Sequence, residues 1–137
     1  MFEVMVETLR AFFKLRAAGK KMGAVTSWGG GSWGLMRSLA LEGPQTVPDL
    51  ARARPVARQR IQKIADELAS AGLVEFMENP AHLRSKLVRL TERGDVKYRE
   101  VTEKILDASD AMARDMAEPD LRTAAAVLRS LNGKLSR

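Results

Sequence analysis

The chain has 137 residues and a formal net charge of +6, with 45% hydrophobic and 29% charged residues. This composition favours one folded domain and argues against intrinsic disorder. The sequence contains no cysteine and a single histidine, His82, which excludes disulfides and thiolate chemistry and predicts neither a metal nor a cofactor. Apolar runs are far shorter than the ~18 residues of a membrane span and no signal peptide is visible, so a cytoplasmic protein without membrane contact is expected.

The positive charge is concentrated in two acid-free segments. Residues 52–63 and 79–91 together hold eight of the 23 basic residues and none of the 17 acidic residues. The remainder of the chain is slightly acidic. Such a distribution indicates a local surface that binds a polyanion rather than a generally basic protein.

The N-terminal part is predicted to form two helices separated by glycines. In residues 2–16, apolar side chains recur at spacings of three and four, which predicts an amphipathic helix. This stripe consists of Phe2, Met5, Leu9 and Phe12. Three glycines at 29–31 interrupt the pattern, because glycine loses the most backbone entropy on ordering. A short helix follows, with Trp33, Met36, Leu39 and Ala40 on one side.

Two further helices are predicted around a tight turn. Thr46 and Asp49 enclose a proline in the T-x-x-D pattern of a helix start. The next helix is predicted from about residue 57 to residue 71, with Gly72 as its stop. Its apolar face consists of Ile61, Ile64, Ala65 and Leu68. At 100° per residue, the opposite face carries Gln59 and Lys63, flanked by Arg60 and Gln62.

A hairpin and two more helices complete the predicted elements. Residues 73–78 and 86–91 alternate in polarity, which predicts two strands joined by a loop with a basic tip. Thr91 is expected to cap a long helix from 92 to about 116, and Pro119 to open the last one. The apolar stripes of these helices are Tyr98, Val101, Ile105, Ala108 and Met112, and Leu121, Ala124, Leu128, Leu131 and Leu135.

Two short helices followed by a basic hairpin are the order of a winged helix-turn-helix, in which one helix enters the DNA major groove. The residues that carry a family resemblance are Leu50-Ala51, Leu68, Gly72-Leu73-Val74, Asn79-Pro80, Arg84, the run Leu87-Val88-Arg89-Leu90-Thr91, and Gly94. In this order and spacing, over about residues 32–94, the chain resembles the MarR family of winged-helix regulators.

The resemblance implies a mainly α fold with a small β-hairpin and a homodimeric DNA-binding transcriptional regulator, often a repressor that a small molecule releases. It also implies that the helix at 57–71 lies in the major groove and that Arg84 enters the minor groove. The sequence departs from the family pattern at His82, where an aspartate is usual, and at Ala57, where a serine or threonine often caps the helix.

The domain organisation follows from these elements. We expect one domain over residues 1–137, with the DNA-binding module at 32–94 and dimerisation helices at 1–22 and 95–137. Three apolar stripes without a partner inside the module predict an intermolecular interface. The predicted interface residues are Phe2, Met5, Leu9, Phe12, Tyr98, Val101, Ile105, Met112, Leu121, Leu128, Leu131 and Leu135.

The candidate sites are two. The predicted DNA-binding residues are Arg54, Arg58, Gln59, Arg60, Gln62, Lys63, His82, Arg84 and Lys86. His82 is equally well interpreted as an exposed loop residue. A pocket for a small aromatic or apolar effector is hypothesised beside Trp28, Trp33 and Met36, although a large aromatic at a helix junction is more often core.

Other classes of protein fit the residues less well. Asp107 and Asp110 lie on the charged face of a helix without a neighbouring histidine or cysteine, so an enzyme is not expected. A membrane-surface role for the first helix is weakened by Glu3 and Glu7. The alternative that stays open is a winged-helix adaptor or architectural protein, which binds DNA without sequence preference or recruits a protein partner.

Overall fold

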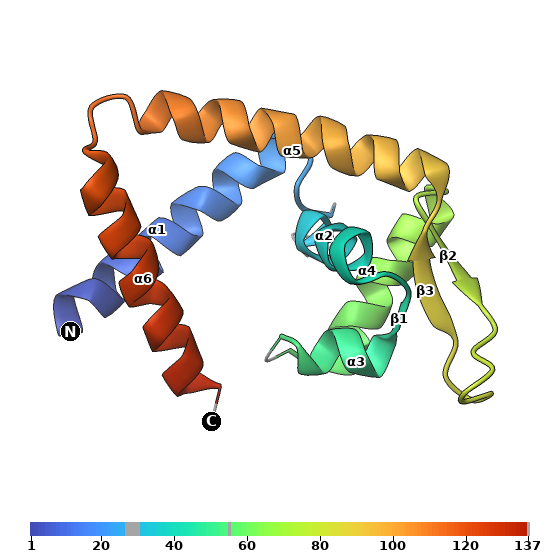
Figure 1. Cartoon of the computed structure of the whole chain (residues 1–137). Helices are drawn as coiled ribbons and strands as arrows, with labels where there is room; N and C mark the ends of the chain where they lie inside the picture. Colours follow the sequence, from blue (N-terminus) through green and yellow to red (C-terminus); the bar gives the residue numbers. More distant parts are fainter. Residues whose placement is uncertain (27–30, 55, 137) are drawn as a thin grey trace. The chain divides into compact units, whose positions relative to one another are not determined.

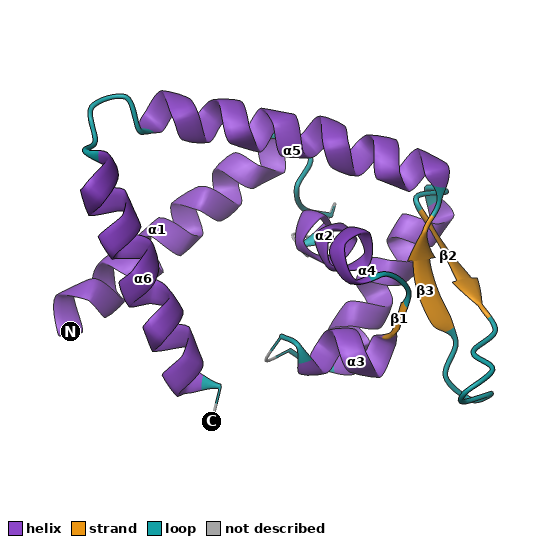
Figure 2. Cartoon of the chain, viewed as in Figure 1, coloured by secondary structure: helices purple, strands orange, loops and turns teal. Residues whose placement is uncertain are grey.

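A computed structural model describes residues 1–26, 31–54 and 56–136 of the chain (Figures 1 and 2). It divides the chain into two compact units, residues 1–105 and residues 106–137. The elements are α1 (Phe2–Lys21), α2 (Ser32–Glu42), β1 (Gln45–Thr46), α3 (Val47–Arg52), α4 (Arg58–Ser70), β2 (Val74–Met77), β3 (Leu87–Leu90), α5 (Glu92–Met112) and α6 (Glu118–Leu135).

The hydrophobic core of the first unit lies among α2, α3, α4 and the sheet. Its largest members are fully buried because four elements each turn one apolar face inward. The core residues are Leu35, Met36, Leu39, Val47, Leu50, Ala51, Ile61, Ile64, Ala65, Leu68, Val74 and Val88. The predicted apolar face of α4 is thereby confirmed. On α2 the prediction was wrong at Ala40, which is exposed, whereas Leu35 takes the inward position.

Side chains and one glycine set the ends of the two central helices. The Thr46 hydroxyl accepts a hydrogen bond from the Asp49 amide at 3.2 Å, so the predicted cap of α3 is confirmed. Helix α4 begins after Ala57 without a side-chain cap. It ends before Gly72, whose φ of +74° lies in the left-handed region that glycine adopts without strain.

The sheet has three antiparallel strands in the order β1-β3-β2. The predicted hairpin is present, with Phe76 opposite Val88 and Val74 opposite Leu90. The strand β1, which pairs Gln45 with Val88, was missed by the sequence analysis. Two residues between a proline and a helix are too short to show an alternating pattern.

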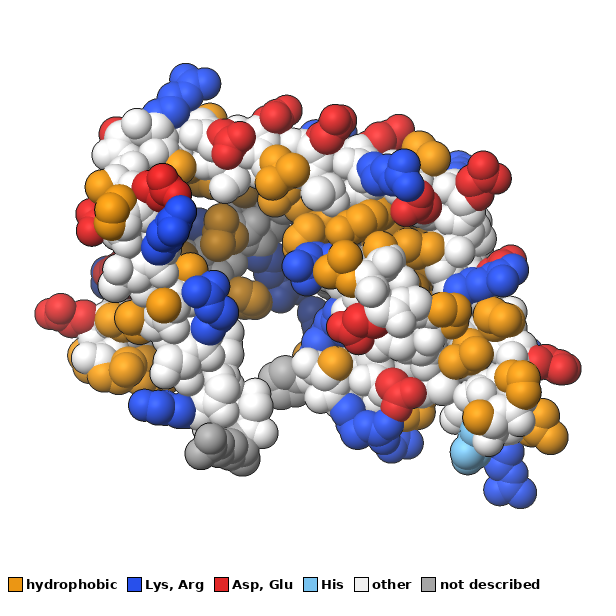
Figure 3. Space-filling model, in the orientation of Figure 1, with side chains coloured by type: hydrophobic (Ala, Val, Ile, Leu, Met, Phe, Trp, Pro, Cys, Tyr) orange, Lys and Arg blue, Asp and Glu red, His pale blue; other side chains and the backbone are white. Residues whose placement is uncertain are grey.

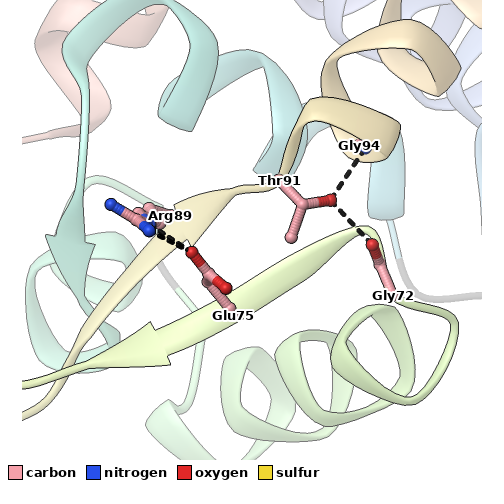
Figure 4. Close-up of polar contacts among 5 residues, drawn as sticks. All are labelled: Gly72, Glu75, Arg89, Thr91 and Gly94. Carbon is pink, nitrogen blue, oxygen red and sulfur yellow. Dashed lines mark hydrogen bonds and ion pairs between the residues drawn. The ribbon is translucent and has the colours of Figure 1, made fainter.

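A threonine joins the end of the sheet to α5 (Figure 4). The Thr91 hydroxyl donates to the Gly72 carbonyl oxygen at 2.7 Å and accepts from the Gly94 amide at 3.0 Å. The Thr91 amide donates to the Leu73 carbonyl at 3.1 Å. These contacts fix the direction in which α5 leaves the wing.

The first half of α5 packs on the winged module. The Trp33 indole nitrogen donates to the Thr102 hydroxyl at 2.9 Å, and the Trp33 ring stacks on Tyr98 with centroids 6.4 Å apart. Val101 is 0% exposed. This part of the stripe therefore has a partner within the chain. The helix ends at Met112, four residues before the predicted end, because a connection over residues 113–117 precedes α6.

The two terminal helices leave apolar side chains in solvent. On α1 only Gly19 is buried, and none of the described residues of α6 is buried. The large exposed apolar side chains on these helices are Phe2, Val4, Met5, Leu9, Phe12, Phe13, Leu15, Leu121, Val127, Leu128 and Leu135. Each helix therefore presents an apolar face that its own unit does not cover.

Candidate nucleic-acid interface

Helix α4 has an inward apolar face and an outward polar face. Ile61 and Ile64 are buried in the core, whereas Arg58, Gln59 and Lys63 are exposed. Because 100° separates successive residues, Gln59 and Lys63 project nearly opposite the buried face. An α-helix that is anchored on one side and polar on the other can enter the major groove of DNA.

The loop between β2 and β3 forms a structured wing. Its backbone turns are closed by hydrogen bonds from Ala81 to the Asn79 side chain, from His82 to the Asn79 carbonyl and from Ser85 to the His82 carbonyl, each at 3.1 Å. His82, Arg84 and Lys86 are exposed. In Figure 3, pale blue histidine atoms lie next to blue lysine or arginine atoms at the lower right of the molecule.

Arg89, the third basic residue of the segment 79–91, is paired with an acidic residue. Arg89 lies on β3 and forms an ion pair with Glu75 on the neighbouring strand β2 (Figure 4). The pair is cross-strand, since Glu75 and Arg89 lie opposite each other in the register. The exposed side chains that give the wing its positive charge are therefore those of Arg84 and Lys86.

A cleft lies between α4 and the wing. It has a volume of about 430 Å³ and is lined by Val47, Pro48, Gln62, Asp66, Phe76, Arg84 and Lys86. Gln62, from α4, and Arg84, from the wing, are thus brought to one surface although they are 22 positions apart in the sequence. Asp66, which was not among the predicted DNA-binding residues, belongs to this surface as well.

Arg54 lies apart from the predicted DNA-binding residues of the wing and of the outward face of α4, and it shares a cavity with Arg60. Its guanidinium donates to the Gly34 carbonyl at 2.6 Å, to the Ser38 hydroxyl at 2.5 Å and to the Leu50 carbonyl at 3.2 Å. Burial lowers the pKa of the Arg54 guanidinium, and the negative charge of Glu42 partly offsets that effect. Arg54 therefore connects α2 with the end of α3.

A larger cavity lies on the opposite side of α4, between α1, α2 and the turn before α4. Its volume is about 550 Å³. Phe12, Leu15, Trp33, Ile61 and Ile64 provide apolar walls, and three arginines, Arg16, Arg54 and Arg60, provide positive charge. Among the residues proposed for an effector pocket, Trp33 lines this cavity. Met36 is 1% exposed and belongs to the core instead, and Trp28 lies outside the described residues.

Two absences hold for the part of the chain that the structure describes. No group of three or more histidine, cysteine, aspartate or glutamate side chains is placed to hold a metal ion. No helix there is long and apolar enough to cross a membrane.

Comparison with solved structures defines the class of fold. A crystal structure of a MarR family transcription regulator superposes with a TM-score of 0.79 at 24% identity, over 98% of this chain and 87% of the other. Staphylococcus aureus MarR, in complex with salicylate and kanamycin, gives a TM-score of 0.77 at 18% identity, covering 98% of this chain and 89% of that one. The chain therefore has the winged-helix fold of the MarR regulators.

Comparison of sequences identifies relatives. No family model matches the chain. The uncharacterized protein Rv2011c of Mycobacterium tuberculosis is 33% identical over 105 residues, which are 77% of this chain and 72% of the relative. The uncharacterized protein Mb2034c of Mycobacterium bovis matches to the same extent. The chain belongs to one family with these mycobacterial proteins.

Proposed function

We propose that the protein is a sequence-specific DNA-binding transcriptional regulator. The observation that carries this proposal is the polar, basic outward face of α4, flanked across a cleft by Arg84 and Lys86 of the wing. Helix α4 would enter the major groove with Arg58, Gln59, Gln62 and Lys63 near base edges and phosphates. The MarR-type fold supports this arrangement, since several structural neighbours are described as transcription regulators.

The active form that we propose is a homodimer. The exposed apolar faces of α1 and α6 support it, because faces of this kind mark interaction sites. The exposed members of the interface predicted from the sequence are Phe2, Met5, Leu9, Phe12, Met112, Leu121, Leu128 and Leu135. A twofold dimer would place two copies of α4 about 34 Å apart, which corresponds to one turn of DNA.

The cavity beside α4 supports regulation by a small ligand. In the simplest case the protein is a repressor, and ligand binding releases it from its DNA site. Apolar walls with arginines fit a planar organic anion, whose body would contact Trp33 and whose charge would face the guanidinium groups. Two structural neighbours are described with such ligands, salicylate in S. aureus MarR and 6-hydroxynicotinic acid in a Bordetella bronchiseptica regulator. We extend that ligand class to this cavity.

The decisive experiment is selection of bound duplexes from a random DNA pool by the purified protein. Enrichment of an inverted repeat with half-sites about one turn of DNA apart would support both the homodimer and sequence-specific recognition of DNA. Salt-sensitive binding without an enriched motif would instead favour an architectural protein. Absence of any DNA binding would overturn the proposal and favour the adaptor.

Variants of the wing sharpen this test. Arg84→Ala should weaken binding to all sequences alike and reduce the slope of log K against log salt by about one. The matched control is Arg99→Ala, because Arg99 lies on α5 and pairs with Asp95 at 2.7 Å. An Arg84→Ala variant with unchanged affinity and slope would show that the wing does not contact DNA.

A further inference from the structure

One carboxylate lies on the face of α4 that is otherwise polar or basic. Asp66 is exposed and follows Lys63 by three positions, so it projects from the outward face rather than from the flank. It also lines the cleft that contains Arg84 and Lys86. A negative charge at this place repels the phosphates that the two basic residues attract, and it weakens non-specific binding.

Asp66 has a defined contact with a neighbouring side chain on the same helix. The Gln62 amide nitrogen donates to the Asp66 carboxylate at 2.8 Å, across one helical turn. An ionised carboxylate has no hydrogen to donate, so it can only accept, and the amide of Gln62 must turn its nitrogen toward Asp66. The carbonyl oxygen of Gln62 is then directed away from Asp66.

This orientation changes what Gln62 can read. A free glutamine amide can present either a donor or an acceptor to a base edge. When its nitrogen is held by Asp66, Gln62 presents its carbonyl oxygen, and the Asp66 carboxylate adds a second acceptor to the same helix. In the major groove the groups that donate to such acceptors are the exocyclic amino groups, N6 of adenine and N4 of cytosine.

We propose that Asp66 is a specificity-determining residue that acts with Gln62 as one acceptor unit for an exocyclic amino group in the major groove. The inference rests on the proposed function, because it assigns a base-reading role to the outward face of α4. Asp66 weakens contact with DNA in general and makes one position of the binding site selective.

The test uses the full-length protein and a panel of duplexes in which each base pair of the selected half-site is replaced in turn. Asp66→Ala and Gln62→Ala should each abolish the preference at the same base pair, where the wild type discriminates roughly five- to 100-fold. The double variant should lose no more than either single variant, because the two residues form one unit. Asp66→Ala should also bind unrelated DNA roughly threefold more tightly, since a repulsive charge has gone.

The charge-matched control is Glu78→Ala, which removes one exposed carboxylate from the start of the wing without touching Gln62. It should leave the preference at every base pair unchanged. Retention of the wild-type preference in Asp66→Ala would overturn the inference while leaving the proposed function intact. A wild-type protein that shows no preference at any base pair would overturn the proposed base reading, and this inference with it.

Discussion

The packing of α5 against the start of β2 can be tested by adding a single carbon atom, the Cβ of an alanine at position 94. A Cβ atom placed on Gly94 would lie 1.8 Å from the Leu73 carbonyl oxygen and 2.8 Å from its carbonyl carbon. Both are backbone atoms, so no side-chain rotation relieves the clash. To reach ordinary contact distance, α5 must move by about 1.5 Å or more relative to the start of β2.

The expected loss of stability follows from the contacts at this junction. Overpacking of this kind costs about 3 kcal/mol at its upper range. A shift also breaks the bonds of Thr91 with the Gly94 amide and the Leu73 carbonyl, at about 1 kcal/mol each. Alanine returns about 1 kcal/mol through its higher helix propensity. Gly94→Ala should therefore lower the free energy of unfolding by about 4 kcal/mol.

Urea denaturation at one fixed protein concentration, followed by tryptophan fluorescence and far-UV circular dichroism, measures this loss. Gly133→Ala is the matched control, since Gly133 lies in α6 and, apart from its chain neighbours and the adjacent backbone of its own helix, no described atom comes within 4 Å of the added Cβ. The same substitution there should be neutral or stabilise by up to about 1 kcal/mol. If Gly94→Ala were as stable as the wild type, the close approach of α5 to Leu73 would be refuted.

Three further substitutions test contacts of the winged module. Thr46→Ala should lower the free energy of unfolding by about 1 kcal/mol, measured in urea, because the Asp49 amide loses its acceptor. Trp33→Phe should lower it by about 1 kcal/mol through loss of the bond to Thr102, and unchanged stability would contradict the docking of α5 on α2. Arg54→Ala should lower the free energy of unfolding by about 2 kcal/mol. It should also weaken DNA binding without changing the slope of log K against log salt. A slope reduced by about one would instead establish a phosphate contact for Arg54.

The strongest local patterns of the sequence predicted most of the fold. The spacing of Ile61, Ile64 and Leu68 identified the buried face of α4, and Gly72 marked its end. Alternation identified both strands of the hairpin. These signals are reliable because each depends only on residues that are close together in the sequence: the spacing of apolar side chains along one element, and the backbone conformation of a single glycine. Pairing of β1 with β3 depends on contacts about 40 residues apart, which a local pattern does not contain.

The apolar stripe of α5 shows the limit of periodicity. Spacing alone grouped Tyr98 and Val101 with Met112 and predicted one surface for a second copy of the chain. In the structure, Tyr98 stacks on Trp33 and Val101 is buried, whereas Met112 is exposed. Periodicity establishes which side of a helix is apolar, but the element that covers it depends on the tertiary arrangement. For the exposed part of the stripe, the dimer stays a prediction.

The basic segment at 52–63 shows the same limit for charge. A count of arginines treats Arg54 and Arg58 as equivalent, yet Arg58 is exposed on α4 whereas Arg54 turns back to the carbonyl of Gly34, 20 positions earlier. The count also stopped before Asp66, because an acidic residue ended the acid-free segment that defined the candidate surface. A base-reading surface needs acceptors as well as cations, since adenine and cytosine present amino donors in the major groove. An acidic residue on the outward face of α4 is therefore a candidate for base specificity, and the contact of Asp66 with the Gln62 amide is the feature to examine.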